Sequence, residues 1–217
     1  MGSQNRKAKI GVVDIETAPA IVATYQFHNT TISEKQVIED GYILCWTWKE
    51  LGKKEVVIRA TPKGYGVGYV ESLKDLRELL DDIDIVVHYN GRRFDIPFVN
   101  KEFLKYGIPP YSPIMHVDLW NATHRAFNFE RSRLAYVTRI LKQYKRMSTR
   151  KGESGGFEGA LACMRGDKKA MREMVKYNKL DVITTEEYFM LIRDWLPATS
   201  GFKRVMEYVN GERSIKC

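Results

Sequence analysis

Two carboxylates spaced two residues apart interrupt an apolar run near the start of the chain. The stretch VVDIETAP, residues 12–19, places Asp14 and Glu16 among valines and an isoleucine. Because side chains alternate between the two faces of a strand, Asp14 and Glu16 would point the same way. Like charges held this close repel each other, so the pair raises the question of what offsets them.

Two later segments carry further acids at chemically suggestive positions. In HYNGRRFDIPF, Asn90 ends a predicted strand and Asp95 begins the next helix, while in KYNKLDV, Tyr177 and Asp181 are four residues apart. Residues at that spacing share one face of a helix, and here the face is partly apolar. A carboxylate is costly in such a place unless a cation meets it.

The four acids share one chemistry. Carboxylates without His or Cys partners are hard oxygen ligands, which suit Mg²⁺ or Mn²⁺ better than zinc. Two such ions close together can clamp the attacking and leaving oxygens of a phosphoryl displacement. We therefore predict a site for two Mg²⁺ or Mn²⁺ ions formed by Asp14, Glu16, Asp95 and Asp181.

The three motifs D-x-E, N-x4-D and Y-x3-D, in this order, resemble the DEDDy branch of the DnaQ-like 3′–5′ exonuclease superfamily. The resemblance covers residues 7–195. It is closest to the proofreading domains of family B DNA polymerases and to their stand-alone, often phage-encoded relatives. It implies an RNase H-like fold, in which Asp14 bridges both ions, Glu16 and Asp181 complete one site, and Asp95 holds the second ion through water.

The resemblance also implies a role for Tyr177, which would orient the attacking water or help to deprotonate it. The histidine branch of the superfamily has its base five residues before the last aspartate. That position is Lys176 here, which indicates the tyrosine branch.

Residues near Asp95 are candidates for substrate contact. Arg92 and Arg93 could bind phosphate, and Phe94 could either stack on a terminal base or belong to the core. Asn90 could hold the loop or the terminal sugar, or it could cap the turn before the following glycine.

A basic segment, residues 131–151, precedes the Gly/Ser-rich stretch GESGG. Basic tracks are typical of nucleic-acid backbone binding, although a charge run is also typical of a solvated face. We predict a mobile loop that guides the strand through Arg146, Arg150 and Lys151.

Hydrophobic periodicity indicates the elements that position these residues. Strands are predicted at 9–16, 42–49, 55–61, 84–90 and 114–120. Helices are predicted at 71–82, 94–107, 132–142, 157–165, 168–195 and 202–210. Three strands followed by alternating helices and strands predict an α/β fold with a mixed five-stranded sheet flanked by helices. The segments 18–41 and 143–157 are predicted to be irregular.

Composition sets the remaining expectations. The 217 residues, 44% of them hydrophobic, suit one domain that spans 1–217 and ends in a helical extension over 196–217. The net charge of +8 suggests a polyanionic partner. Three widely spaced cysteines fit neither a disulfide framework nor a zinc site, and no apolar run reaches membrane-spanning length. We expect a cytoplasmic protein, in the host cytoplasm if it is phage-encoded, with no membrane partner.

These observations together predict a two-metal 3′–5′ exonuclease that releases mononucleotides from single-stranded DNA ends. It would serve replication proofreading or repair, alone or with a DNA polymerase or replisome partner. Two alternatives stay open: an RNA 3′ exonuclease of the RNase D kind, and a non-catalytic nucleic-acid-binding or polymerase-accessory module. Four mutually repelling carboxylates argue against the second alternative.

Overall fold

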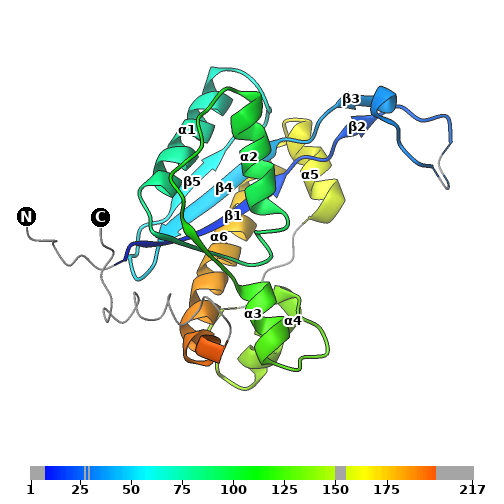
Figure 1. Ribbon diagram of the computed structural model, residues 1–217. Helices are drawn as coiled ribbons and strands as arrows, with labels where there is room; N and C mark the ends of the chain where they lie inside the picture. The colour runs from blue at the N-terminus through cyan, green and yellow to red at the C-terminus, as the bar shows by residue number, and fades with distance from the viewer. Residues whose placement is uncertain (1–7, 27, 29, 150–154, 199–217) are drawn as a thin grey trace, which may run out of the picture.

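A five-stranded mixed sheet forms the centre of the computed structural model, which describes residues 8–26, 28, 30–149 and 155–198 (Figure 1). The strand order is β5-β4-β1-β6-β7. The strands are β1 (Ile10–Thr17), β4 (Ile43–Glu50), β5 (Val57–Ala60), β6 (Ile85–His88) and β7 (Met115–Asp118). β4 pairs antiparallel with β1 and β5, whereas β1, β6 and β7 run parallel. The predicted mixed sheet is confirmed.

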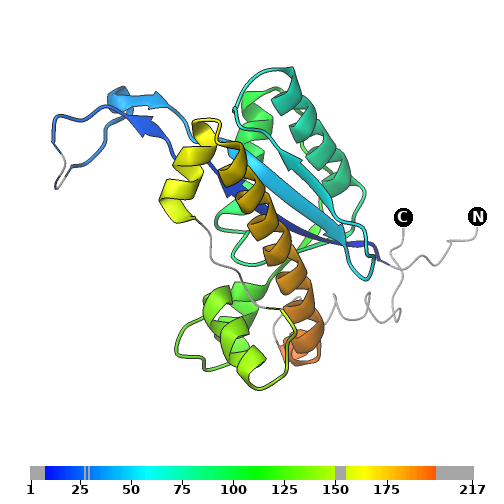
Figure 2. The same cartoon turned by 180° about the vertical axis from the view of Figure 1, so that it is seen from behind.

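Helices cover both faces of this sheet. They are α1 (Val67–Asp81), α2 (Asp95–Lys105), α3 (Leu119–Ala126), α4 (Leu134–Gln143), α5 (Gly156–Met164) and α6 (Lys168–Ile192). α1 and α2 lie on one face, and the long α6 crosses the other (Figures 1 and 2). α3 and α4 gather near the C-terminal half of α6. No helix in the described ranges combines the length and the apolar character needed to span a membrane.

The pairing of β1 with β4 sorts their side chains onto the two faces. Residues directly opposite each other in an antiparallel ladder share a face. Val13 lies opposite Trp48, and Ile15 lies opposite Trp46, so these pairs are apolar and buried. The alternate residues, which include Asp14, lie opposite polar partners such as Thr47 on the face that α6 crosses. Because of this alternation, the side chains of Asp14 and Glu16 point towards α6.

Two segments differ from the sequence-based expectation. The strand predicted at 114–120 ends at Asp118, because the Asp118 carboxylate accepts a hydrogen bond from Trp120 N and caps α3. The segment 18–41, predicted to be irregular, forms a two-stranded arm of β2 (Ile21–Val22) and β3 (Val37–Glu39), with the 3₁₀ turn η1 (Glu34–Gln36). The arm projects from the sheet (Figure 1).

The end of the chain is only partly described. A second 3₁₀ segment, η2 (Arg193–Ala198), follows α6. The helix predicted at 202–210, and the extension predicted over 196–217 from residue 199 onward, lie outside the described residues.

Candidate active site

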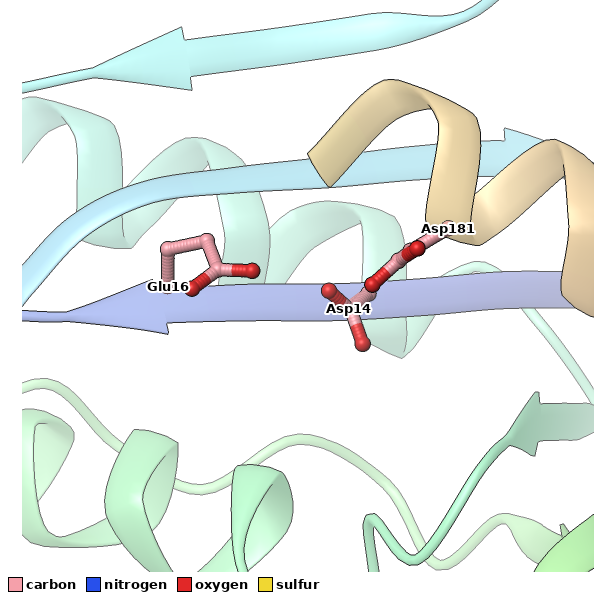
Figure 3. A group of neighbouring side chains, drawn as sticks. All are labelled: Asp14, Glu16 and Asp181. Carbon is pink, nitrogen blue, oxygen red and sulfur yellow. The ribbon is translucent and has the colours of Figure 1, made fainter. Parts of the chain in front are cut away.

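Three of the four predicted acids converge between β1 and α6. One carboxylate oxygen from each of Asp14, Glu16 and Asp181 lies within 4.8 Å of the others. Figure 3 shows Asp14 between Glu16 and Asp181, with α6 passing over β1. The Asp181 residue is only 1% exposed, whereas Asp14 and Glu16 are half-buried. An all-oxygen group of this kind suits a hard divalent cation.

Asp95 reaches the same strand but lies outside this three-carboxylate group. It is the first residue of α2 and is buried, and its Oδ1 accepts a hydrogen bond from Ile15 N at 3.1 Å. Ile15 stands between Asp14 and Glu16 in the sequence. The structure therefore fastens Asp95 to the backbone of the strand that carries the other two acids.

α6 contributes two further residues to the site. Tyr177 is half-buried and lies one turn before Asp181, on the same side of the helix. Asn178 is fully buried, and its Nδ2 donates a hydrogen bond to Asp14 Oδ2 at 2.7 Å. Sequence reasoning gave Asn178 no role. The signal was present, since Asn178 precedes Asp181 by three residues on a helix and so shares its face.

The pKa values of two thiols near the carboxylates are raised. Burial, followed by the charges of Glu16 and Asp14, raises the pKa of the Cys45 thiol well above its usual value. The pKa of Cys163 is raised by burial and then by the charges of Asp167 and Glu16. Both thiols are therefore held protonated beside the acids. The same negative charges would attract a cation.

Comparison with known proteins identifies the fold that carries this geometry. The RNase H superfamily matches residues 69–193, which is more than half of the chain. The chain belongs to the RNase H superfamily. The matched range contains Asp95, Tyr177 and Asp181 but begins after β1, so the convergence of Asp14 and Glu16 with Asp181 is an independent observation of the structure.

The predicted likeness to a family B DNA polymerase is confirmed at the level of the fold. The structure of the family B DNA polymerase from the hyperthermophilic archaeon Pyrobaculum calidifontis is similar to this chain, with a TM-score of 0.60 at 13% sequence identity. The similarity covers 94% of this chain and 28% of the polymerase. A search of curated proteins finds no match.

In this RNase H superfamily member, Asp118 shapes the loop that leads to α2. Its Oδ1 accepts hydrogen bonds from Asn90 N at 2.9 Å and Trp120 N at 3.0 Å, and its Oδ2 accepts one from Arg92 N at 3.3 Å. Asn90 takes a left-handed backbone conformation with φ of 66°. Asp118 therefore has a structural role, and it fixes the approach to Asp95.

The three residues directly before Asp95 face solvent. Arg92 and Arg93 are exposed, and the Arg92 Nη2 group donates to His116 O at 3.3 Å. Phe94 is 47% exposed, with its ring centroid 5.9 Å from that of Phe98, so it is not a core residue. Two guanidinium groups and an open aromatic ring thus stand directly beside the site.

His88 lies beneath this loop and is held by hydrogen bonds. His88 is fully buried, its Nδ1 accepts from Gly91 N at 3.1 Å, and its Nε2 faces His116 Nδ1 at 3.3 Å. Burial, followed by the charges of His116 and Arg92, lowers the pKa of His88 to about 3. His88 is therefore neutral at working pH and supports the loop through its hydrogen bonds.

The described part of the basic segment is fastened to α6. Ser148 N and Oγ donate to Glu187 Oε1 at 2.5 and 2.8 Å, and Thr149 N donates to Glu187 Oε2 at 2.8 Å. Met147 is buried, and these contacts anchor the described end of the segment 131–151, for which the sequence predicts a mobile loop. Arg146 is exposed at the rim of a cavity of about 190 Å³ lined mainly by aromatic and aliphatic side chains. Arg150 and Lys151 lie outside the described residues.

Proposed function

We propose that the chain is a divalent-metal-dependent 3′–5′ exonuclease that hydrolyses single-stranded DNA ends to mononucleotides. The observation that carries the proposal is the convergence of Asp14, Glu16 and Asp181 within 4.8 Å. Membership of the RNase H superfamily supports a nuclease, and the order of the D-x-E, N-x4-D and Y-x3-D motifs supports the 3′–5′ direction.

The donor set fits the ions that this chemistry requires. Its atoms are carboxylate oxygens, Asp181 is buried, and the field at Cys45 shows that the surroundings are negative. Asp14, Glu16 and Asp181 would hold Mg²⁺ or Mn²⁺, and we assign Asp95 to a second ion through water. Bound there, the two ions would lower the pKa of an attacking water and stabilise charge on the phosphate.

The protein's own groups would orient the reactants. A phenolic hydroxyl can both donate and accept a hydrogen bond, so Tyr177 is suited to aim an attacking water. Its place one turn before Asp181 fixes it on the same helix as a ligand of the site. The Ile15 amide holds Asp95 at 3.1 Å and so keeps that carboxylate beside β1.

The exposed loop before α2 would bind the end of the substrate. Arg92 and Arg93 would contact phosphates, since guanidinium groups match phosphate geometry, and Phe94 would stack on a terminal base. Asn90 is assigned to the terminal sugar. Arg146, Arg150 and Lys151 would follow the strand away from the site, in keeping with the net charge of +8.

The biological setting that we propose is DNA replication or repair. The similar polymerase is more than three times as long as the part that this chain matches, because the match covers 28% of it. A DNA polymerase or another replisome component is the partner that we propose, and all the acids of the candidate site come from this chain.

An assay on matched single-stranded DNA and RNA oligonucleotides, labelled at either end, tests this function. With Mg²⁺ or Mn²⁺, we expect 3′-labelled DNA to release a labelled mononucleotide first and 5′-labelled DNA to give a ladder of shortening products. Chelator should stop the reaction. Early internal fragments, label release from the 5′ end, or no cleavage with either metal would reject the proposal, and faster hydrolysis of RNA would change the substrate.

A further inference from the structure

The interface between α6 and the sheet contains several buried polar groups beside its apolar packing. On β4, Thr47 lies opposite Asp14 and Lys49 lies opposite Val12, so both side chains face α6. Lys49 is buried and pairs with Glu186 of α6 at 2.6 Å. Buried polar groups cost free energy unless they are hydrogen-bonded, so each of them calls for an explanation.

Asn178 is the member of this layer that touches a carboxylate of the site. It is 0% exposed, and its Nδ2 donates to Asp14 Oδ2 at 2.7 Å. A carboxylate can only accept, so this contact also determines which amide atom faces Asp14. The bond joins α6 to β1 across 164 residues of sequence.

The other amide atom of Asn178 has a different environment. Its Oδ1 is buried without a hydrogen-bond partner among the described residues. An unmatched buried acceptor costs about 1–3 kcal/mol, which offsets most or all of the gain from one good hydrogen bond. Fold stability alone therefore does not account for an amide at this position, where an apolar side chain of similar size would avoid the cost.

We propose that Asn178 is a positioning residue that orients Asp14 for metal binding, an inference that rests on the proposed function. The amide holds one Asp14 oxygen and so fixes the orientation of the carboxylate. Because the amide is neutral, it fixes the carboxylate without a positive charge that would compete with the metal. Groups that orient a metal ligand in this way typically contribute 10–100-fold to metal affinity.

Mn²⁺ binding to the whole protein, measured by isothermal titration calorimetry without substrate, tests the proposal independently of activity. Asn178→Leu keeps the side-chain size but removes the donor, and Asn178→Ser provides a smaller second variant. We expect both to raise the Kd for Mn²⁺ about tenfold or more. Circular dichroism and urea denaturation in chelator would show that the variants are folded and report their metal-free stability.

Thr184→Val is a matched control. Thr184 is also fully buried on α6, and its hydroxyl has no hydrogen-bond partner among the described residues. A general disturbance of the α6 interface would affect this variant as well, whereas a specific effect on Asp14 would not. We expect the Kd of Thr184→Val to stay within twofold of the wild-type value.

Two results would overturn the proposal, and they differ in what they say about the function. If the wild type binds Mn²⁺ but both Asn178 variants match it within twofold, or if Thr184→Val weakens binding equally, Asn178 is only a packing residue and the proposed nuclease stands. If the wild type binds no Mn²⁺ at millimolar concentration, both the positioning role and the metal-dependent function are rejected.

Discussion

The two faces of the β1–β4 pair differ in what they bury. Towards α1 and α2, Val13 and Ile15 pack with Trp48 and Trp46, and Trp46 Nε1 donates to Ser72 Oγ of α1 at 2.9 Å. Towards α6, the same strands present the acids of the site, with Thr47 opposite Asp14 and Lys49 opposite Val12. One face is an apolar core, whereas the other combines apolar packing of Val12 and Val182 with buried polar groups.

One face of these two strands therefore contributes mainly to stability, and the other carries the candidate site. Apolar burial stabilises the fold, whereas carboxylates within 4.8 Å of each other repel and lower stability when no cation is present. Substitutions on the two faces should therefore have opposite signatures. Those on the α6 face should remove activity and spare the metal-free fold, and those on the α1–α2 face should do the reverse.

The largest effect is expected from the acids. Asp14→Asn or Asp181→Asn should lower activity at least about 1,000-fold, because a metal ion contributes several kcal/mol of transition-state stabilisation. In chelator, both variants should be as stable as the wild type or more stable, since a repulsive charge is removed. Nuclease assays and urea denaturation measure the two quantities.

Glu78→Gln is the control for these acids, because Glu78 is an exposed carboxylate on α1. It should change neither activity nor stability. Full activity in purified Asp14→Asn or Asp181→Asn would remove the acids of the α6 face from the mechanism.

Substitutions on the face towards α1 and α2 should lower the stability of the fold. Trp46 is 1% exposed, and Trp46→Ala should lower the free energy of unfolding by about 3–5 kcal/mol, the usual cost of emptying a buried aromatic site. Mn²⁺ affinity of the folded fraction should be kept. Phe94→Ala is the comparison, since its ring is partly exposed and its removal should cost much less stability. A loss of metal affinity in Trp46→Ala equal to that in Asp14→Asn would contradict the separation of the two faces.

A smaller effect on the α6 face separates Tyr177 from the acids. Tyr177→Phe removes one hydroxyl and keeps the ring, so it should lower kcat by about 10–1,000-fold and leave metal and substrate binding nearly unchanged. Single-turnover kinetics over a range of Mg²⁺ concentrations would show this, with the exposed Tyr144→Phe as control. If Tyr177→Phe kept the wild-type rate while His116→Gln were inactive, a histidine rather than Tyr177 would act on the attacking water.

Local pattern was sufficient to predict much of this arrangement. The alternation of β1 placed Asp14 and Glu16 on one face, where their carboxylates meet that of Asp181 (Figure 3). Helical spacing placed Tyr177 one turn before Asp181, and both residues lie on α6. The five strands were also predictable, because short apolar runs bounded by turns are a local signal.

Contacts between distant segments could not be predicted in the same way. The bond from Asn178 to Asp14 spans 164 residues, and that from Ser148 to Glu187 spans 39. Neither leaves a periodic signal in the sequence. The start of α3 was missed because only the capping Asp118 separates an apolar strand from an apolar helix start. Such features depend on tertiary packing, which outweighs local propensity.

The smallest effect should come from the basic segment, residues 131–151, which contributes no acid to the candidate site. Arg146 is exposed next to the part of the segment that Glu187 fastens to α6. If Arg146 contacts a phosphate, Arg146→Gln should reduce the log–log salt dependence of single-strand binding by about 0.7, the value per contact for single strands.

Replacing Arg146, Arg150 and Lys151 together should reduce this salt dependence by about 2. The kcat at saturating substrate should be unchanged, because none of the three side chains is a proposed metal ligand. Lys74→Gln on α1 is the control, since Lys74 pairs with Glu71 on the opposite face of the sheet. An unchanged slope in the triple variant would identify the segment as a solvated face and leave the loop of Arg92 and Arg93 as the proposed phosphate contact.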